Sequence, residues 1–165
     1  MVFGIKDPEQ ERREREELEK LRRDKEEREK KEREEEEKLK KEWEEKMIKE
    51  IENIKTQINN LKNENEIENK KTQINNLKNE IVGLEQRIIQ TKISDDPAKD
   101  NVLKQGLLKS LDEAYYSLDS AYQMIESNDI GKANNYIDYA QKVINDAYNS
   151  LSLNQNKDQS LGMAY

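Results

Sequence analysis

The chain of 165 residues is unusually rich in charge: 41% of its residues are charged, 32% are hydrophobic, and the formal net charge is −7. Globular proteins are closer to a quarter charged and almost half apolar, so this chain cannot bury a core in proportion to its length. It contains no His and no Cys. That excludes disulfides, Cys/His zinc sites and His-based nucleophilic catalysis, and we expect no enzyme, no cofactor and no metal.

Residues 1–6 form a short apolar N-terminal hook ahead of a charged segment. Val2, Phe3 and Ile5 are candidate partner contacts, because apolar anchors of this kind fill grooves on other proteins. The alternative is a frayed end without a partner.

Residues 7–42 predict a charged single α-helix. Asp7 is suited to cap the free amides and Pro8 to occupy the first turn. From Pro8 to Glu42, thirty of thirty-five residues are charged, and a dozen acid-to-base pairs lie four residues apart. At roughly 0.2–0.5 kcal/mol each, such pairs hold a helix that has no tertiary partner. Two interpretations stay open, a solvated spacer or a surface that lies against a charged partner.

Residues 43–66 carry apolar side chains at spacings of three and four, which is typical of a coiled-coil helix or of a packed helix face. The pattern predicts a surface for a protein partner, with self-association through residues 43–93 as one form of it. The candidate contacts are Trp43, Met47, Ile51 and Ile58, within a stripe that also includes Ile54 and Leu61.

An internal repeat links this helix to the next segment. The fourteen residues from Ile51 to Glu64 recur at 67–80 with one change, Ile54 becoming Lys70. The offset of sixteen residues rotates the second apolar stripe by about 160° on a straight helix. Either one continuous rod presents two faces, or the chain breaks near residues 63–65. The absence of Gly and Pro there favours the continuous rod.

Residues 67–152 predict a helical bundle with helices at about 67–93, 97–126 and 129–152, either as an antiparallel hairpin or as a three-helix bundle. Asp96 and Pro97 start the second helix, and Asn128 or Asp129 starts the third. Residues 153–165 are expected to be a flexible tail. Small residues recur every seven positions along the proposed bundle seam, where they let two backbones approach closely: Ala114, Ala121, Ala133, Ala140 and Ala147.

The predicted fold is therefore all-α, with a long charged helix, a coiled-coil segment and a C-terminal bundle. Such a chain is best interpreted as a cytoplasmic, non-enzymatic scaffold or adaptor, whose helical spacer connects protein partners bound at its two ends. One alternative is a ribosome- or ribonucleoprotein-associated factor that lies on RNA, although the acidic balance disfavours it. Another is a subunit of a filament or viral assembly. We expect no membrane span, because apolar stretches reach only two or three residues. We also expect no small-molecule substrate, because nothing in the sequence builds a cleft that would hold catalytic carboxylates.

Overall fold

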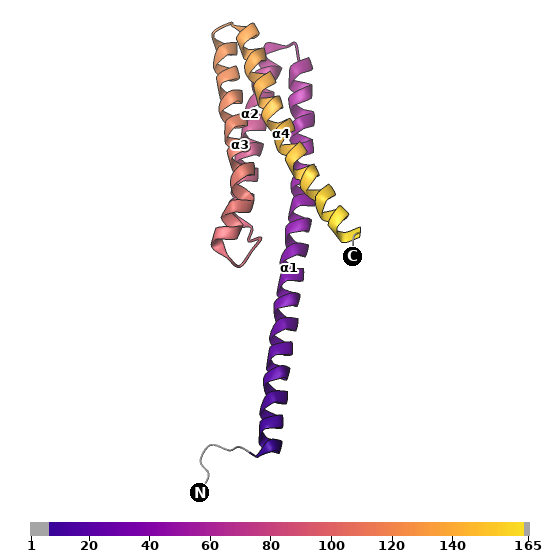
Figure 1. Cartoon of the computed structure of the whole chain (residues 1–165). Helices are drawn as coiled ribbons and strands as arrows, with labels where there is room; N and C mark the ends of the chain where they lie inside the picture. The colour runs from indigo at the N-terminus through magenta and orange to yellow at the C-terminus, as the bar shows by residue number, and fades with distance from the viewer. Residues whose placement is uncertain (1–6, 164–165) are drawn as a thin grey trace. The chain divides into compact units, whose positions relative to one another are not determined.

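The computed structural model of the chain describes the backbone of residues 7–163 and the side chains of residues 7–155. Within these residues it contains four helices and no strand (Figure 1). The helices are α1 (Pro8–Asn63), α2 (Ile67–Gln90), α3 (Pro97–Glu126) and α4 (Ile130–Met163). The all-α class is confirmed. The chain divides into two compact units, residues 1–39 and residues 40–165, which are described in turn.

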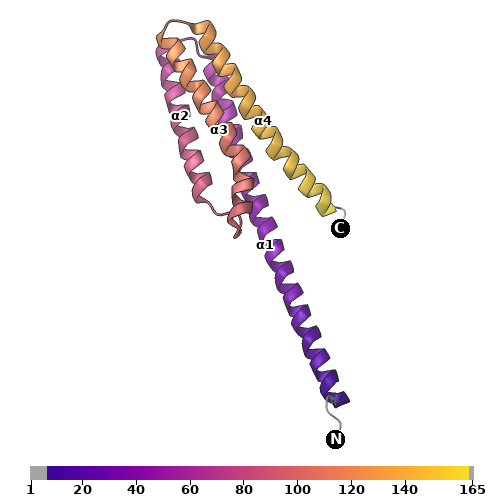
Figure 2. The ribbon, with the colours of Figure 1, turned by 60° about the vertical axis from the view of Figure 1, so that its left-hand side comes forward.

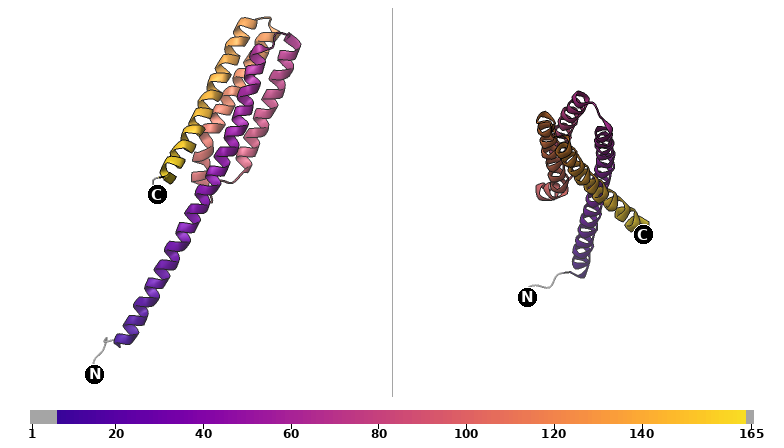
Figure 3. Two further views of the ribbon diagram at one scale, coloured as in Figure 1. Left: turned by 90° about the vertical axis from the view of Figure 1, so that its right-hand side faces the viewer. Right: turned by 90° about the horizontal axis from the view of Figure 1, so that it is seen from above.

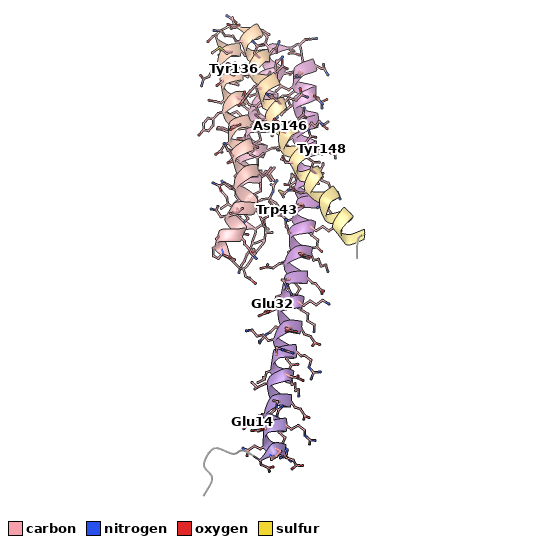
Figure 4. All side chains as sticks on the ribbon, viewed as in Figure 1. Glu14, Glu32, Trp43, Tyr136, Asp146 and Tyr148 are labelled. Carbon is pink, nitrogen blue, oxygen red and sulfur yellow. The ribbon has the colours of Figure 1, made fainter. Side chains whose placement is uncertain are left out.

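The first unit is the charged part of α1, and none of its described residues is buried. Asp7 accepts a hydrogen bond from the Glu9 amide at 3.2 Å, which caps the helix start. Side chains project from all sides of this segment (Figure 4). Its ion pairs join neighbouring turns: Arg15 with Glu11 at 3.6 Å, Arg12 with Glu16 at 3.9 Å and Arg22 with Glu26 at 4.0 Å. Local charge pairs, and no apolar face, accompany this helix.

The second unit encloses one hydrophobic core that draws on all four helices. Residues 40–63 of α1 supply Trp43 to Leu61, and α2 supplies Ile74 to Ile88. The two apolar stripes of the repeat therefore lie in the same core. The expectation of one continuous rod is wrong, because the helix ends at Asn63 and a new helix begins at Ile67. A reversal at 64–66 is what allows two stripes with opposite directions on a straight helix to meet.

The reversal between α1 and α2 is made by polar side chains. Glu64 Oε1 accepts a hydrogen bond from the Glu66 amide at 3.0 Å, and Glu66 Oε2 accepts one from Asn69 Nδ2 at 2.8 Å. Lys70 is 5% exposed, and its Nζ donates to the Glu64 carbonyl at 3.5 Å and to Asn134 Oδ1 at 2.9 Å. Lys70, the one residue that differs between the repeat copies, thus links the turn between α1 and α2 to Asn134 on α4. Burial lowers the pKa of Lys70, and the charge of Glu64 opposes this effect.

Polar contacts between the helices of the second unit define their directions. Between α1 and α2, Gln57 bonds Glu80 at 2.6 Å and Glu50 pairs with Arg87 at 3.5 Å. Each step forward along one helix is a step back along the other, so the two run antiparallel. The same reversal of order relates two further pairs, α2 with α3 (Lys71–Glu126, Lys78–Asp119) and α1 with α4 (Lys62–Asp138, Asn59–Gln141, Glu44–Gln155). Within the second unit, residues 40–63 of α1 lie beside α2, α3 and α4 (Figure 2 and Figure 3).

The connection between α2 and α3 is held by a buried ion pair. Lys104 is 5% exposed and lies 2.7 Å from Asp100, and its Nζ also donates to the carbonyls of Ile89 and Thr91 at the end of α2. Asp100 Oδ1 accepts from the amide of Ile93 at 2.7 Å. The hydrogen bonds that Asp100 accepts from Lys104 and from the Ile93 amide lower the pKa of Asp100. The polar network explains why α2 ends at Gln90, before the expected residue 93.

The turn between α3 and α4 comprises residues 127–129. Asn128 adopts φ 60°, a left-handed conformation that Asn tolerates better than most residues. Asp129 Oδ1 accepts from the Lys132 amide at 3.1 Å and starts α4. The helix then continues to Met163, past the expected end at residue 152. Gln155 is buried there and donates to the Lys41 carbonyl at 3.1 Å, so α1 supplies a surface for this extension.

The shared core leads to a first prediction about residues 40–63. Ile58 is fully buried, so Ile58→Ala should lower the free energy of unfolding by about 2–5 kcal/mol. Urea denaturation followed by the fluorescence of Trp43, the single tryptophan, measures this loss. Leu21→Ala in the first unit is the control. Leu21 is 66% exposed, so this change should stay within about 0.5 kcal/mol of the parent. Equal small effects of both variants would contradict the four-helix core.

Candidate functional site: a tyrosine groove on α3 and α4

The structure changes the interpretation of the contact residues expected from the sequence. Val2, Phe3 and Ile5 lie outside the described residues. The other four candidates are not on the surface, because they are 7% exposed or less and fill the core of the second unit: Trp43, Met47, Ile51 and Ile58. A partner reaches them only by displacing a helix. Their burial agrees with a packed helix face, and their role as partner contacts stays a prediction.

The alanines of the expected seam are also buried. Ala114 and Ala121 on α3 and Ala133 and Ala140 on α4 have no exposed surface, and Ala147 is 7% exposed. They bring side chains of the first turns of α4 close to the middle of α3. This approach determines the surface that the two helices present outward.

That outward surface contains a shallow groove of about 550 Å³ between α3 and α4. Three tyrosine side chains line it and remain open to solvent, with exposures of 67% for Tyr116, 39% for Tyr136 and 48% for Tyr139. Figure 4 labels Tyr136 near the start of α4. The remaining lining residues are smaller or polar: Glu113, Ser117, Ser120 and Asn135. We call this set of seven residues the tyrosine groove.

Ser117 links the two helices that form the tyrosine groove. Its side chain is buried, and Oγ donates a hydrogen bond of 2.6 Å to the backbone carbonyl of Tyr136. This bond joins α3 directly to α4 at the point where the groove crosses between them. Ser117 and the three tyrosines thus line the same groove.

Tyr116 is oriented by a chain of contacts that reaches α2. Its ring meets the ring of Tyr115 edge to face, with centroids 5.6 Å apart and an interplanar angle of 89°. The ammonium of Lys78 lies 5.1 Å from the centroid of Tyr115 and 2.6 Å from Asp119. Tyr115 is therefore fixed from the α2 side, and it limits the positions open to Tyr116.

A pair of carboxyl groups lies between α2 and α3, next to Glu113 in the sequence but outside the lining of the tyrosine groove. Asp112 precedes Glu113 on α3, and Asp112 forms a side-chain hydrogen bond with Glu85 of α2. Partial burial of Glu85, followed by the charge of Asp112 and their hydrogen bond, raises the pKa of Glu85 to about 7.

The described part of the chain offers little for other kinds of site. No group of three or more Asp, Glu, His or Cys side chains among the described residues is arranged to hold a metal ion. None of the helices in the described range is long and apolar enough to cross a membrane. Comparison with protein-family models, curated proteins and solved structures gave no match for this chain. The tyrosine groove therefore has to be interpreted from its own chemistry.

Sequence reasoning missed the tyrosine groove, although a signal was present. All seven tyrosines follow residue 114, and Tyr116 and Tyr139 lie away from the heptad positions that predict the core. Apolar rings off the core stripe indicate a binding surface when they gather on one face. Recognising that face requires the pairing of α3 with α4, which brings residues twenty positions apart together.

The Glu85–Asp112 pair generates a prediction about pH. Between about pH 4.5 and 7 the folded protein keeps a proton on Glu85 that the unfolded chain has lost, so this pair lowers stability as pH rises. Glu85→Gln mimics the protonated form. Its free energy of unfolding relative to the parent should therefore increase from pH 5 to pH 8, as measured by urea denaturation at each pH.

Glu45→Gln, which removes one exposed carboxyl from α1, is the matched control for the loss of a charge. A difference between Glu85→Gln and the parent that stays constant across this pH range would show that Glu85 is not the group responsible.

Proposed function

We propose that the protein is a non-enzymatic scaffold or adaptor. The second unit binds a protein partner through the tyrosine groove, and the charged helix of residues 8–39 acts as a spacer toward a second partner. The observation that carries the proposal is the set of three exposed tyrosines on one rigid surface. Tyrosine is enriched at the centres of protein interfaces because it offers a large apolar area at a low cost in side-chain entropy.

The charged helix supports the spacer part of the proposal. Leu18 and Leu21 are each 66% exposed, and no stripe of apolar residues accompanies them. Side chains paired along the helix leave nothing that requires burial. At about 1.5 Å per residue, residues 8–39 extend over about 50 Å. The length of this segment is therefore the property that suits it to be a spacer.

We also propose a specific packing for the helices of the second unit. The seams of residues 43–66 and 67–90 pack in coiled-coil fashion inside the second unit, and α3 with α4 forms an antiparallel hairpin that presents the groove. Support comes from the buried stripes and from the Ser117–Tyr136 bond. Self-association through residues 43–93, binding to RNA or a ribosome, a role in a filament or viral assembly, and a cytoplasmic location stay predictions.

Affinity capture from the native host tests the adaptor function with the full chain. The double variant Tyr116→Ala/Tyr139→Ala should lose the partner of the second unit, whereas Ile89→Ala should retain it. Ile89 is 63% exposed on α2 and does not line the groove, so it is a control for loss of exposed apolar area. Quantitative mass spectrometry compares the amount of each protein captured by a variant with the amount captured by the parent. Identical capture by both variants would contradict the role of the groove.

The spacer is tested by a distance within the first unit. The chain has no Cys, so Gln10→Cys and Leu39→Cys accept two spin labels at exposed positions. Deleting residues 14–31 removes five whole turns, and the label distance should fall by about 27 Å. Double electron–electron resonance measures both distances. A broad distribution without a defined maximum in either protein would show that residues 10–39 are not a strut.

A further inference from the structure

We propose that the charged helix of the first unit pairs with a second copy of itself in antiparallel orientation. The interface is one face of residues 21–39, which we call the leucine seam. Its six positions alternate at spacings of four and three: Leu21, Lys25, Arg28, Glu32, Glu35 and Leu39. This inference goes beyond the proposed function, because it gives the spacer a partner of its own and does not involve the tyrosine groove.

The leucine seam belongs to an eighteen-residue repeat in the charged helix. Sixteen of the eighteen positions from 11 to 28 carry the same charge as the position eighteen residues later, or the same leucine. Eighteen residues make five whole turns, so equivalent positions lie on one line along the helix. Leu21 and Leu39 are equivalent in this way, and their side chains are 66% and 50% exposed. They form the two apolar ends of the seam.

The four charged residues between these leucines are available to a partner. At about 100° per residue, all six positions of the seam fall within about 80° around the helix axis. Each of them is exposed. In the described part of the chain, no ion pair or hydrogen bond joins the charged side chains of the seam to another residue, whereas Arg22 pairs with Glu26 on another face.

The order of charge along the leucine seam selects an antiparallel partner. The half next to Leu21 is basic, and the half next to Leu39 is acidic. An antiparallel second copy reverses this order, so each basic half meets an acidic half. A parallel copy in register places bases against bases and acids against acids. The contacts expected across the antiparallel interface, each occurring twice, are Leu21 with Leu39, Lys25 with Glu35 and Arg28 with Glu32.

Other faces of the same helix do not match a second copy in this way. The seam one position further on begins at Arg22 and ends at Lys40, and antiparallel pairing there places these two cations together. It also places Glu26 against Glu36. The cause is the repeat, because the two outermost positions of such a seam are eighteen residues apart and carry the same charge. Leucine at both outer positions removes this repulsion from the leucine seam.

The residues that flank the leucine seam mostly agree with the same register. Like charges meet only near the two-fold axis, where Glu29 faces Glu29 and Lys31 faces Lys31 of the second copy. Contacts between opposite charges outnumber these, because they occur on both sides of the axis. The flanking pairs of opposite charge are Arg22 with Glu36 and Asp24 with Lys38.

The pairing is expected to be weak and sensitive to salt. Exposed ion pairs contribute little each, and long side chains keep their charged ends at the wet edge of the interface. The Debye length falls from about 10 Å at 0.1 M salt to about 3 Å at 1 M, so salt screens these contacts. Antiparallel pairing would attach one second unit at each end of the paired segment, and the adaptor would become bivalent.

Sedimentation equilibrium of the full chain tests the pairing. At about 50 mM salt the mean mass should rise from one chain toward two between about 10 µM and 1 mM protein, and the Kd should increase by about ten-fold or more at 1 M salt. Lys25→Glu/Arg28→Glu makes the seam acidic, and Glu32→Lys/Glu35→Lys makes it basic. Each double variant should raise the Kd by about ten-fold or more, and an equal mixture of the two should form mixed dimers.

A charge swap tests the register of the pairing. The quadruple variant combines both double changes, so it keeps the net charge of the parent and exchanges the two halves of the seam. Antiparallel pairs are complementary again, and the Kd should return to within about three-fold of the parent value. Lys30→Glu/Arg33→Glu is the matched control, with the same change of charge at the same spacing but off the seam. It should weaken pairing less than Lys25→Glu/Arg28→Glu does, and circular dichroism verifies that every variant remains helical.

Spin-label distances between two copies give their orientation. The chain has no Cys, so Lys30→Cys and Arg12→Cys each introduce one label on the face opposite the seam. Residue 30 lies at the centre of the antiparallel register, so its two labels should be separated only by the width of the pair, about 20–30 Å. Residue 12 lies eighteen residues away, so its labels should be offset by about 54 Å along the axis. Double electron–electron resonance measures both distances.

Several results would overturn the proposal. One is a mean mass that stays at one chain at every concentration. Dimers that persist in both double variants, or that the off-seam control weakens equally, would place self-association elsewhere. A quadruple variant that does not regain pairing, or a short distance at residue 12, would reject the antiparallel register. If host capture still depends on Tyr116 and Tyr139 while the chain stays monomeric, the adaptor function stands and only the pairing with a second copy is wrong.

Discussion

The architecture of the second unit depends on the sixteen-residue offset of the internal repeat. On a straight helix the two apolar stripes point in nearly opposite directions, so a single rod cannot bury both against itself. The break at residues 64–66 folds the second copy back on the first, and both stripes enter one core. The substitution of Lys70 for the isoleucine of the first copy serves the reversal, because its ammonium reaches the Glu64 carbonyl and Asn134.

Once α1 and α2 are antiparallel, the position of the tyrosine groove follows by register. Lys71 and Lys78 of α2 pair with Glu126 and Asp119 of α3, which sets α3 beside α2 and turns Tyr115 toward the Lys78 ammonium. Tyr116, one residue on, then faces outward. The same contacts that align the core therefore position a side chain of the surface site.

Much of the fold could be predicted from local signals, and the rest could not for physical reasons. The helix starts after Asp7 and Asp96 are visible because a cap satisfies amides within its own first turn. The break near Glu64 was the less favoured of two alternatives because it uses no Gly or Pro, and its stability comes from Lys70 and from the shared core. The groove was missed because Tyr116 and Tyr139 meet only through the tertiary pairing of α3 with α4.

The two units are stabilised by different interactions, and this difference bears on function. Exposed ion pairs in residues 8–39 act between adjacent turns, so each turn carries its own small contribution and salt screens it. The buried core lies between Trp43 and Leu151, and none of the described residues 7–39 belongs to it. Removing whole turns from the charged helix therefore takes no contact away from the groove. Under the proposed function, such a chain could change the length of its spacer without rebuilding the surface proposed to select its partner.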